Sequence, residues 1–190
     1  MLKPTYAIPS LPPEAQIETV PVLKALARAS RALADLKGQA KTIPNQGILI
    51  DTLALQEAKA SSEVENIVTT QDELFQADVF PEDPQSPAAK EVALYRDALR
   101  LGYARLGETG GLIPNSALIE MFRLLKGRSD GFRVTPGTAL KNEQTGEIVF
   151  VPPQDAHEIV RHMTALERFI NDDELSDLDP LIKMALIHHQ

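Results

Sequence analysis

Apolar residues in the first two thirds of the chain recur at the three- and four-residue steps of amphipathic helices. This spacing predicts helices over residues 17–40, 47–66, 87–106 and 115–126. Pro87 suits the first turn of the third helix, and Gly127 suits the end of the fourth. Thr70 and Glu73 have the spacing of a capping box, which predicts a further short helical segment. Together these segments indicate a helical bundle.

The helix predicted over residues 47–66 carries two different rows of side chains. One row is an apolar stripe made of Leu49, Leu53, Ala60, Val64 and Ile67. The other row consists of Glu57, Ser61 and Glu65, which follow one another at four-residue steps. Such a polar row is either a solvated helix face, with Asn66 near the C-terminal cap, or a functional site.

The periodicity changes after residue 130. Runs at 132–140 and 147–151 flank a loop, Asn142–Gly146, and predict a β-hairpin. Asp155 and Glu158 then open a helix whose buried stripe is expected to contain Ile159, Met163, Leu166 and Phe169. Asp179 and Pro180 start a last helix that is apolar nearly all round, so we expect it to be buried on several sides.

Composition excludes several classes of function. The net charge is −8, and the 19 Lys and Arg residues are scattered, which argues against binding of nucleic acid. The absence of cysteine excludes disulfides and thiolate metal sites. His157 and His162 lie five residues apart, which disfavours a metal site on one helix face. The sequence has no signal peptide or membrane-spanning run, so we expect no membrane association and a cytoplasmic location.

Ser61, Glu65 and Asn66 match, in register, a pattern of Ser or Thr, three residues of any kind, Glu, and then Gly or Asn. With its surroundings, LQEAKASSEVEN, this stretch resembles the N-terminal inhibitory segment of Fic-family proteins, which transfer AMP from ATP to protein hydroxyls. The later stretches GFRVTPGTALKNEQTGEIVFVPP and DPLIKMALIHHQ are similar, in the expected order, to the first part of the Fic core.

The resemblance implies a mainly α fold, a helical bundle of the Fic type with one β-hairpin. Residues 1–110 would be the Fic N-terminal region, with the inhibitory helix at about 47–66. Residues 111–190 would be the truncated first part of the core, with the hairpin that the family calls the flap at about 132–151. In the flap, a target protein would be held by strand addition along Thr145, Gly146, Glu147, Ile148, Val149, Phe150 and Val151.

The implied mechanism is regulatory. The family's inhibitory glutamate, here Glu65, pairs with the second arginine of the catalytic motif HxFx(D/E)GNGRxxR and denies it to the γ-phosphate of ATP. Ser61 would stabilise the helix turn or the carboxylate. The motif itself is absent from the sequence, and neither His188 nor His189 fits it. We therefore expect no catalytic residue and no metal site in residues 1–190.

ATP and Mg²⁺ are cofactors of the complete family protein, and we expect neither to bind this chain tightly. The expected function is that of the front part of a self-inhibited AMP-transferase, inactive by itself. Two alternatives stay open: a free-standing module that inhibits a separate Fic enzyme in trans, or an inactive remnant. Expected partners are the protein substrate of the complete enzyme and either a second copy or a separate Fic protein.

Overall fold

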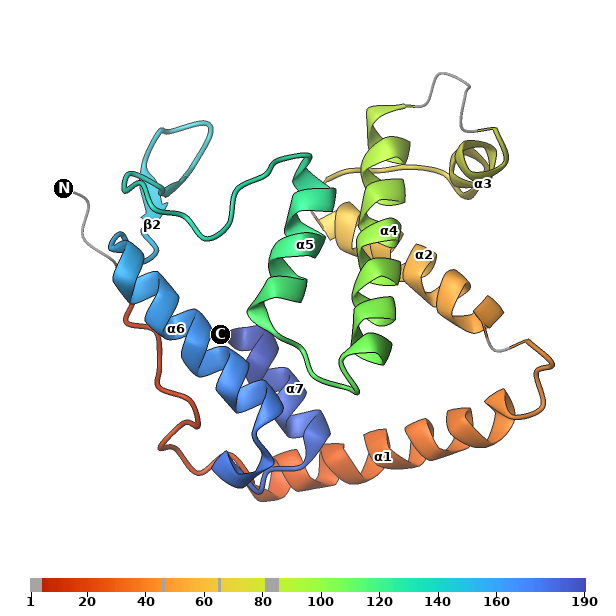
Figure 1. The fold of residues 1–190 in the computed structure, drawn as a ribbon, viewed down its shortest axis with the longest axis horizontal. Helices are drawn as coiled ribbons and strands as arrows, with labels where there is room; N and C mark the ends of the chain where they lie inside the picture. The colour runs from red at the N-terminus through yellow and green to blue at the C-terminus, as the bar shows by residue number, and fades with distance from the viewer. Residues whose placement is uncertain (1–4, 46, 65, 81–85) are drawn as a thin grey trace. The chain divides into compact units, whose positions relative to one another are not determined.

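The computed structural model describes residues 5–45, 47–64, 66–80 and 86–190. Within them the fold is mainly helical, with one antiparallel two-stranded hairpin, as predicted (Figure 1). In chain order the elements are α1 (Val20–Ala40), α2 (Gly47–Val64), α3 (Gln71–Val79), α4 (Pro87–Glu108), α5 (Asn115–Lys126), β1 (Leu140–Lys141), β2 (Ile148–Phe150), α6 (Ala156–Asn171), the 3-10 turn η1 (Asp173–Leu175) and α7 (Pro180–His189).

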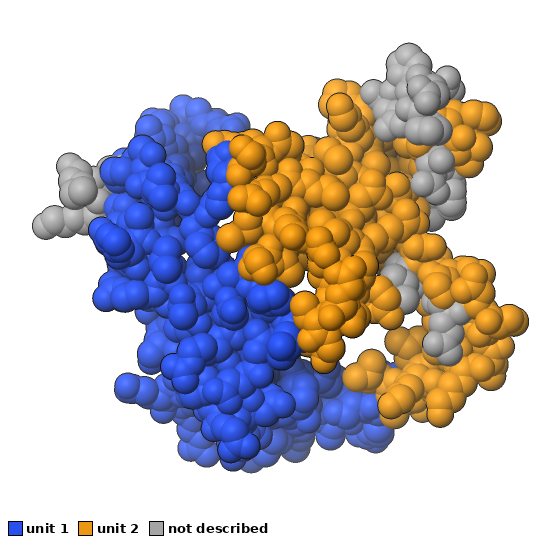
Figure 2. Space-filling model, in the orientation of Figure 1, with its two compact units in different colours: residues 1–32, 112–115, 130–190 blue, residues 33–111, 116–129 orange. Residues whose placement is uncertain are grey.

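The chain forms two compact units, coloured separately in Figure 2. The first unit comprises residues 1–32, 112–115 and 130–190, and the second comprises residues 33–111 and 116–129. The first therefore contains the hairpin with α6 and α7, and the second contains α2, α3 and α4. None of the described helices is both long and apolar enough to cross a membrane.

The second unit is centred on the packing of α2 and α3 against α4. Its buried cluster consists of Ala58, Leu74, Ala89 and Val92. Ala54, Ala58 and Ser62 form the buried row of α2 at four-residue spacing. Small residues on this row let the backbones of α2 and α4 approach closely. Leu55 and Tyr95 pack at the margin of the cluster.

This arrangement corrects the apolar stripe expected on α2. Leu53 and Val64 are 53% and 85% exposed, and Ala60 is also exposed. The physical reason is that close packing of helices selects small side chains, whereas the prediction weighted the larger apolar residues. The buried face of α2 is therefore the row of Ala54, Ala58 and Ser62.

Helix starts follow the local chemistry of the sequence. The Ser86 side chain accepts a hydrogen bond from the Ala89 N–H at 3.1 Å, and Pro87 occupies the first turn of α4. Asp155 caps α6 by accepting from the Glu158 N–H at 2.8 Å. These N-terminal caps lie where the sequence predicts them, whereas α4 runs to Glu108, beyond its predicted end.

In the first unit, Phe169 of α6 is fully buried and packs beneath α7. Lys183 of α7 is also buried, with its ammonium 5.4 Å from the centre of the Phe169 ring and 3.2 Å from a carboxylate oxygen of Asp173. Met184 is 60% exposed, so the expectation that α7 is buried on several sides is wrong. The helix instead buries one side, formed by Ile182 and Lys183.

Candidate functional site

Ser61 lies in the last turn of α2, one row away from the buried row of that helix. Its hydroxyl donates a hydrogen bond to a carboxylate oxygen of Glu57, one turn earlier, at 2.7 Å. Two members of the predicted polar row, Glu57 and Ser61, are therefore in direct contact. Because the neighbouring Ala58 and Ser62 are buried against the unit's core, the row is carried on a fixed face of the helix.

Asn66 follows the end of α2 with a left-handed backbone, at φ 62°. The Asn66 N–H donates to the Glu63 carbonyl at 3.1 Å, and the Ile67 N–H donates to the Ser62 carbonyl at 2.9 Å. This pair of bonds is the Schellman arrangement, which satisfies carbonyls at a helix C-terminus. Gly and Asn are the residues that tolerate this conformation best, which accounts for the Gly-or-Asn position of the pattern.

Glu65, the glutamate of the pattern, lies outside the described residues. In the sequence it follows Val64, the last residue of α2, and precedes the left-handed Asn66.

The segment after Asn66 is fixed by the predicted capping box at the start of α3. The Thr70 hydroxyl accepts from the Glu73 N–H at 3.2 Å, while the Glu73 carboxylate accepts from the Thr70 N–H at 2.8 Å. The Thr69 hydroxyl also donates to this carboxylate, at 2.9 Å. The hydrogen bond from the Thr70 backbone, followed by those from the two hydroxyls, lowers the pKa of Glu73 below its ordinary value.

The hairpin of the first unit pairs Leu140 with Phe150 and Lys141 with Ile148, with an irregularity between the two pairs. Its loop closes on Asn142, whose side-chain oxygen accepts from the N–H groups of Gln144 and Thr145. Gly146 has φ 72°, a left-handed conformation that glycine adopts without strain. The loop predicted at residues 142–146 is confirmed.

The first strand is much shorter than predicted, because strand structure begins only at Leu140 instead of residue 132. Residues before it make other contacts: the Gly137 N–H donates to the Gln154 side-chain oxygen at 2.7 Å. The Gln154 amide nitrogen donates to the carbonyls of Thr138 and Pro152, at 3.0 and 2.6 Å. Pro136 has no N–H group to donate to a strand partner. The hydrogen bonds of the buried Gln154 side chain take the place of strand-to-strand hydrogen bonds here.

Side chains along the second half of the hairpin differ in exposure. Ile148, Val149 and Phe150 are 40%, 60% and 36% exposed, whereas Val151 is buried. Thr145, Gly146 and Glu147 are exposed as well. The structure thus presents an apolar strand at the surface of the unit and anchors its end at Val151.

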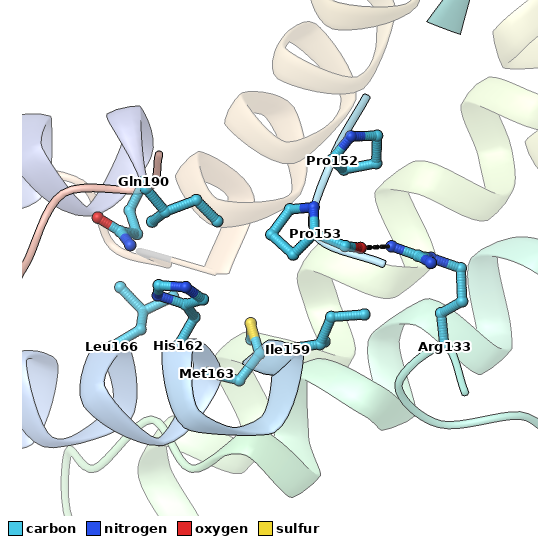
Figure 3. Close-up of a pocket in the computed structure, with 9 residues that line it drawn as sticks. Arg133, Pro152, Pro153, Ile159, His162, Met163, Leu166 and Gln190 are labelled. Carbon is cyan, nitrogen blue, oxygen red and sulfur yellow. Dashed lines mark hydrogen bonds between the residues drawn. The ribbon is translucent and has the colours of Figure 1, made fainter. Parts of the chain in front are cut away.

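A cavity of about 260 Å³ lies at the base of the hairpin (Figure 3). Its apolar walls come from Ile8, Pro152, Pro153, Ile159, Met163 and Leu166. Arg133, His162 and Gln190 add the polar groups. Arg133 donates to the carbonyls of Pro153 and Thr135, and no described carboxylate pairs with it. Three of the residues predicted as the buried stripe of α6 therefore line a cavity.

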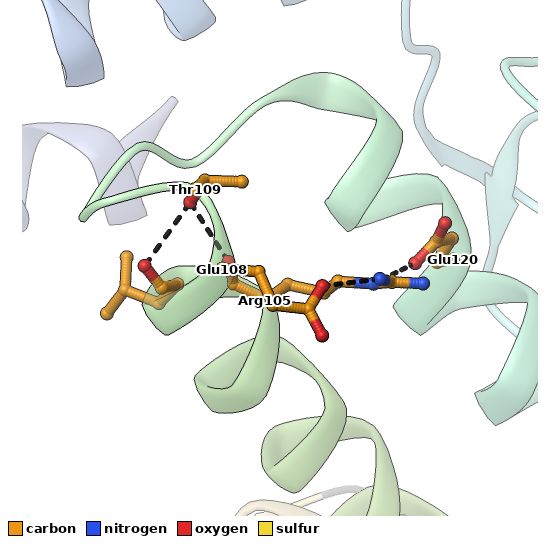
Figure 4. Close-up of polar contacts among 5 residues, drawn as sticks. Arg105, Glu108, Thr109 and Glu120 are labelled. Carbon is orange, nitrogen blue, oxygen red and sulfur yellow. Dashed lines mark hydrogen bonds and ion pairs between the residues drawn. The ribbon is translucent and has the colours of Figure 1, made fainter.

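One further polar cluster lies in the second unit, where Arg105 of α4 reaches Glu120 of α5 at 2.7 Å and Glu108 at 2.6 Å (Figure 4). The hydrogen bonds to Glu108 and Glu120 raise the pKa of Arg105 above its usual range. The cluster is exposed and braces two neighbouring helices, so its role is structural.

Sequence reasoning missed Thr5, Arg133 and Gln154, which shape the base of the hairpin. Thr5 bonds to Val151, 146 residues away, and no local pattern reports such a pairing. Gln154, which follows Pro152 and Pro153 after the second strand, is the buried amide that holds the loop, and no local pattern marks it.

No group of three or more His, Asp or Glu side chains among the described residues is placed to hold a metal ion. In comparison with known families, residues 23–104 match the sequence model described as Fic/DOC family N-terminal. The matched stretch includes α2, α3 and most of α4, and with them Ser61, Glu65 and Asn66.

Proposed function

We propose a function from the premise that this chain is a Fic-family protein carrying the family's N-terminal domain. In the proposal, residues 1–190 are the regulatory and target-holding region of a protein AMP-transferase. Glu65, which follows the last residue of α2 in the sequence, is the inhibitory glutamate, and the hairpin holds the target protein.

The observation that carries the proposal is the end of α2. The last residue of the pattern, Asn66, lies just beyond the end of α2 and has a left-handed backbone, the conformation that the two residues allowed at this position, Gly and Asn, tolerate best. The same turn carries the hydrogen bond between Ser61 and Glu57, so the pattern's first residue has a partner that holds the turn.

The proposed chemistry of Glu65 is charge pairing. A carboxylate accepts two parallel hydrogen bonds from a guanidinium, and an arginine engaged in this way is not free to bind a phosphate. Glutamine or glycine at position 65 would abolish the charge-assisted pair. The arginine concerned belongs to the family's catalytic motif, which is not among residues 1–190.

The hairpin supports the second half of the proposal. An exposed strand whose N–H and C=O groups face outward can pair with an extended segment of another protein, with main-chain hydrogen bonds giving affinity. In the described two-stranded sheet β2 pairs with β1 on one edge, which leaves its other edge for such pairing, and the side chains of Ile148, Val149 and Phe150 are exposed.

ATP and Mg²⁺ are the cofactors of the proposed reaction, but the described residues offer no group of side chains that fits Mg²⁺. A nucleotide needs an anion-binding nest with phosphate-binding arginines, and Mg²⁺ needs carboxylate oxygens. The described residues include no metal-binding group of three or more acidic or histidine side chains. We derive no step of AMP transfer from this chain.

The test joins residues 1–190 to a Fic catalytic segment that contains HxFx(D/E)GNGRxxR and measures transfer of labelled AMP to protein. We expect Glu65→Gly and Glu65→Gln each to raise transfer at least about tenfold, because loss of one charged pair is a loss of roughly 1.5–3 kcal/mol. Glu63→Gln is the matched control, since Glu63 is a glutamate two residues earlier in the sequence and pairs with Lys59 at 2.5 Å. Equal transfer by the Glu65 variants and the parent fusion would refute the inhibitory role.

Adding the isolated chain to a Fic enzyme whose own inhibitory glutamate has been replaced tests action in trans. Slowing that disappears with Glu65→Gln and persists with Glu63→Gln would identify a trans-acting inhibitor.

A further inference from the structure

The N-terminal arm, residues 5–9, already occupies the end of the flap strand. The Thr5 N–H donates to the Val151 carbonyl at 3.2 Å. In return, the Val151 N–H donates to the Thr5 hydroxyl at 3.0 Å. The arm thus uses both main-chain groups of Val151, as an added strand would.

Three residues further along the arm, Ile8 reaches the cavity at the base of the hairpin. Pro152 and Pro153, which follow Val151 directly, form part of the same cavity. A segment that bonds to Val151 is therefore led to the cavity within three residues, and the residue placed there is apolar.

The arm is held weakly. Thr5, Tyr6, Ala7 and Pro9 are exposed. Among the described residues, the only other hydrogen bond of this stretch runs from the Gln190 amide to the Pro9 carbonyl at 3.4 Å. Ile8 forms one wall of the cavity and leaves about 260 Å³ unfilled. A segment with a larger apolar side chain at this position would bury more surface in the cavity than the arm does.

We propose that residues 5–8 are an intramolecular stand-in for the target segment, and that the cavity is the pocket for a large apolar side chain of that target. This inference rests on the proposed target-holding role of the flap. The target is an extended protein segment whose residue at the third position after the one bonded to Val151 is aromatic or large aliphatic. Arm and target compete for the same place.

Charge restricts the pocket further. The Arg133 side chain is a guanidinium cation, and its described hydrogen bonds go to neutral carbonyls. A lysine or arginine of the target at the pocket position would meet a like charge beside apolar walls. The pocket therefore rejects basic side chains.

Synthetic peptides test the inference directly. The reference peptide is TYAIPSLP, residues 5–12 of this chain, and three further peptides carry Phe, Ser or Lys in place of Ile8. Binding is measured by NMR shifts of the Val149 and Val151 amides and of the Met163 methyl group. The receptors are the unmodified chain and the double variant Thr5→Val, Ile8→Ser, in which the arm loses its hydroxyl acceptor and its apolar side chain.

We expect the double variant to bind the Ile and Phe peptides at least about tenfold more tightly than the unmodified chain, because the arm no longer competes. The Phe peptide should bind most tightly, and the Ser and Lys peptides at least about tenfold more weakly than the Ile peptide. Unchanged Ile148 and Phe150 amide shifts in the unliganded double variant would show that the hairpin stays folded.

Each other result overturns the inference in an identifiable way. Peptides that shift Val149 and Val151 without preference at the pocket position leave strand addition standing and refute the pocket. Equal affinity for both receptors refutes competition by the arm. Absence of binding to both receptors refutes the pocket and the target-holding flap together, while the Glu65 fusion assay still reports on the inhibitory role separately.

Discussion

The backbone N–H of Ile67 donates to the carbonyl oxygen of Ser62 across the end of α2, at 2.9 Å. This bond closes only if the residue before Ile67 turns left-handed, and Asn66 does so with φ 62°. The pattern formed by Ser61, Glu65 and Asn66 thus contains a helix stop at its last residue.

Replacing Asn66 tests this stop. Asn66→Val should destabilise the chain by about 1–2 kcal/mol, because a side chain in the left-handed region meets the following carbonyl oxygen. Asn66→Gly should be close to neutral, because glycine adopts the region freely. Urea unfolding followed by circular dichroism compares the two. Equal losses from Val and Gly would mean that the asparagine side chain, and not its backbone conformation, holds the turn.

Ala58 tests the packing of α2. Ala58→Leu should cost about 1–3 kcal/mol, because Ala58 is fully buried in the cluster with Ala89 and Val92 and has no room for a larger side chain. Ala60→Leu, on the exposed face of the same helix, should change stability by less than about 0.5 kcal/mol. Thermal unfolding of both variants decides the matter. A loss that is larger at Ala60 would restore the stripe expected from the sequence.

The two faces of α2 illustrate what the sequence could and could not predict. Helix starts such as Pro87 in the first turn of α4, and the cap formed by Asp155 with Glu158, depend on neighbours within three residues, so local patterns predicted them. Which face of α2 is buried depends on how closely α4 approaches it. The spacing of apolar residues along the chain carries no information about that distance. Small residues such as Ala58 therefore carried too little weight in the prediction.

The base of the hairpin was harder to predict for the same reason. Its first strand depends on where Gln154 binds the loop, and its end depends on Thr5. Both partners are distant in sequence and carry no recognisable motif. In the candidate site, the turn and loop residues were predictable from their chemistry, whereas the cavity required the packed structure.

Ser61 allows a stability effect to be separated from a regulatory one. Ser61→Ala removes a partly exposed hydrogen bond to Glu57 within one helix, which stabilises by only about 0.5 kcal/mol. In the fusion assay we expect transfer of AMP to rise by less than with Glu65→Gln. Glu57→Gln keeps an acceptor for the hydroxyl and should change transfer less than Ser61→Ala does. A loss of folding in Ser61→Ala, seen by circular dichroism, would instead mark the serine as essential for the helix.

Glu73 gives the chain a dependence on pH. Its pKa is lowered from the ordinary value of 4.5, chiefly by the hydrogen bond from the Thr70 backbone. Its contribution to stability is therefore complete above that ordinary value and is lost as the pH falls through the lowered pKa. Glu73→Gln lacks the titrating group. The stability difference between the parent chain and this variant should shrink on acidification below pH 4.5.

Unfolding in urea at a series of pH values measures that difference. A difference that stays constant between about pH 6 and about pH 3 would show that the Glu73 carboxylate adds nothing when ionised. Asp72→Asn, which changes the neighbouring exposed carboxylate, controls for the general effect of charge on α3.

Gln154 should control the hairpin from its base. Its amide nitrogen donates to the carbonyls of Thr138 and Pro152, and its oxygen accepts from Gly137, so its described hydrogen bonds use both ends of the amide. Gln154→Glu places a carboxylate against two carbonyl oxygens in a buried position. We expect a loss of about 1–3 kcal/mol at pH 7, because the hydrogen bonds donated to Thr138 and Pro152 are lost and a carboxylate oxygen faces their carbonyl oxygens.

The consequences should be local to the hairpin and measurable by amide hydrogen exchange. The Gly137 and Val151 amides should exchange faster in Gln154→Glu, and acidification should slow them again, because the protonated acid regains one donor. Gln144→Glu makes the same change of charge in the exposed hairpin loop and should leave both amides unchanged. If Gln154→Glu exchanged like Gln144→Glu, the buried amide would not hold the hairpin, and the pocket beneath it would have to be formed by the prolines and α6 alone.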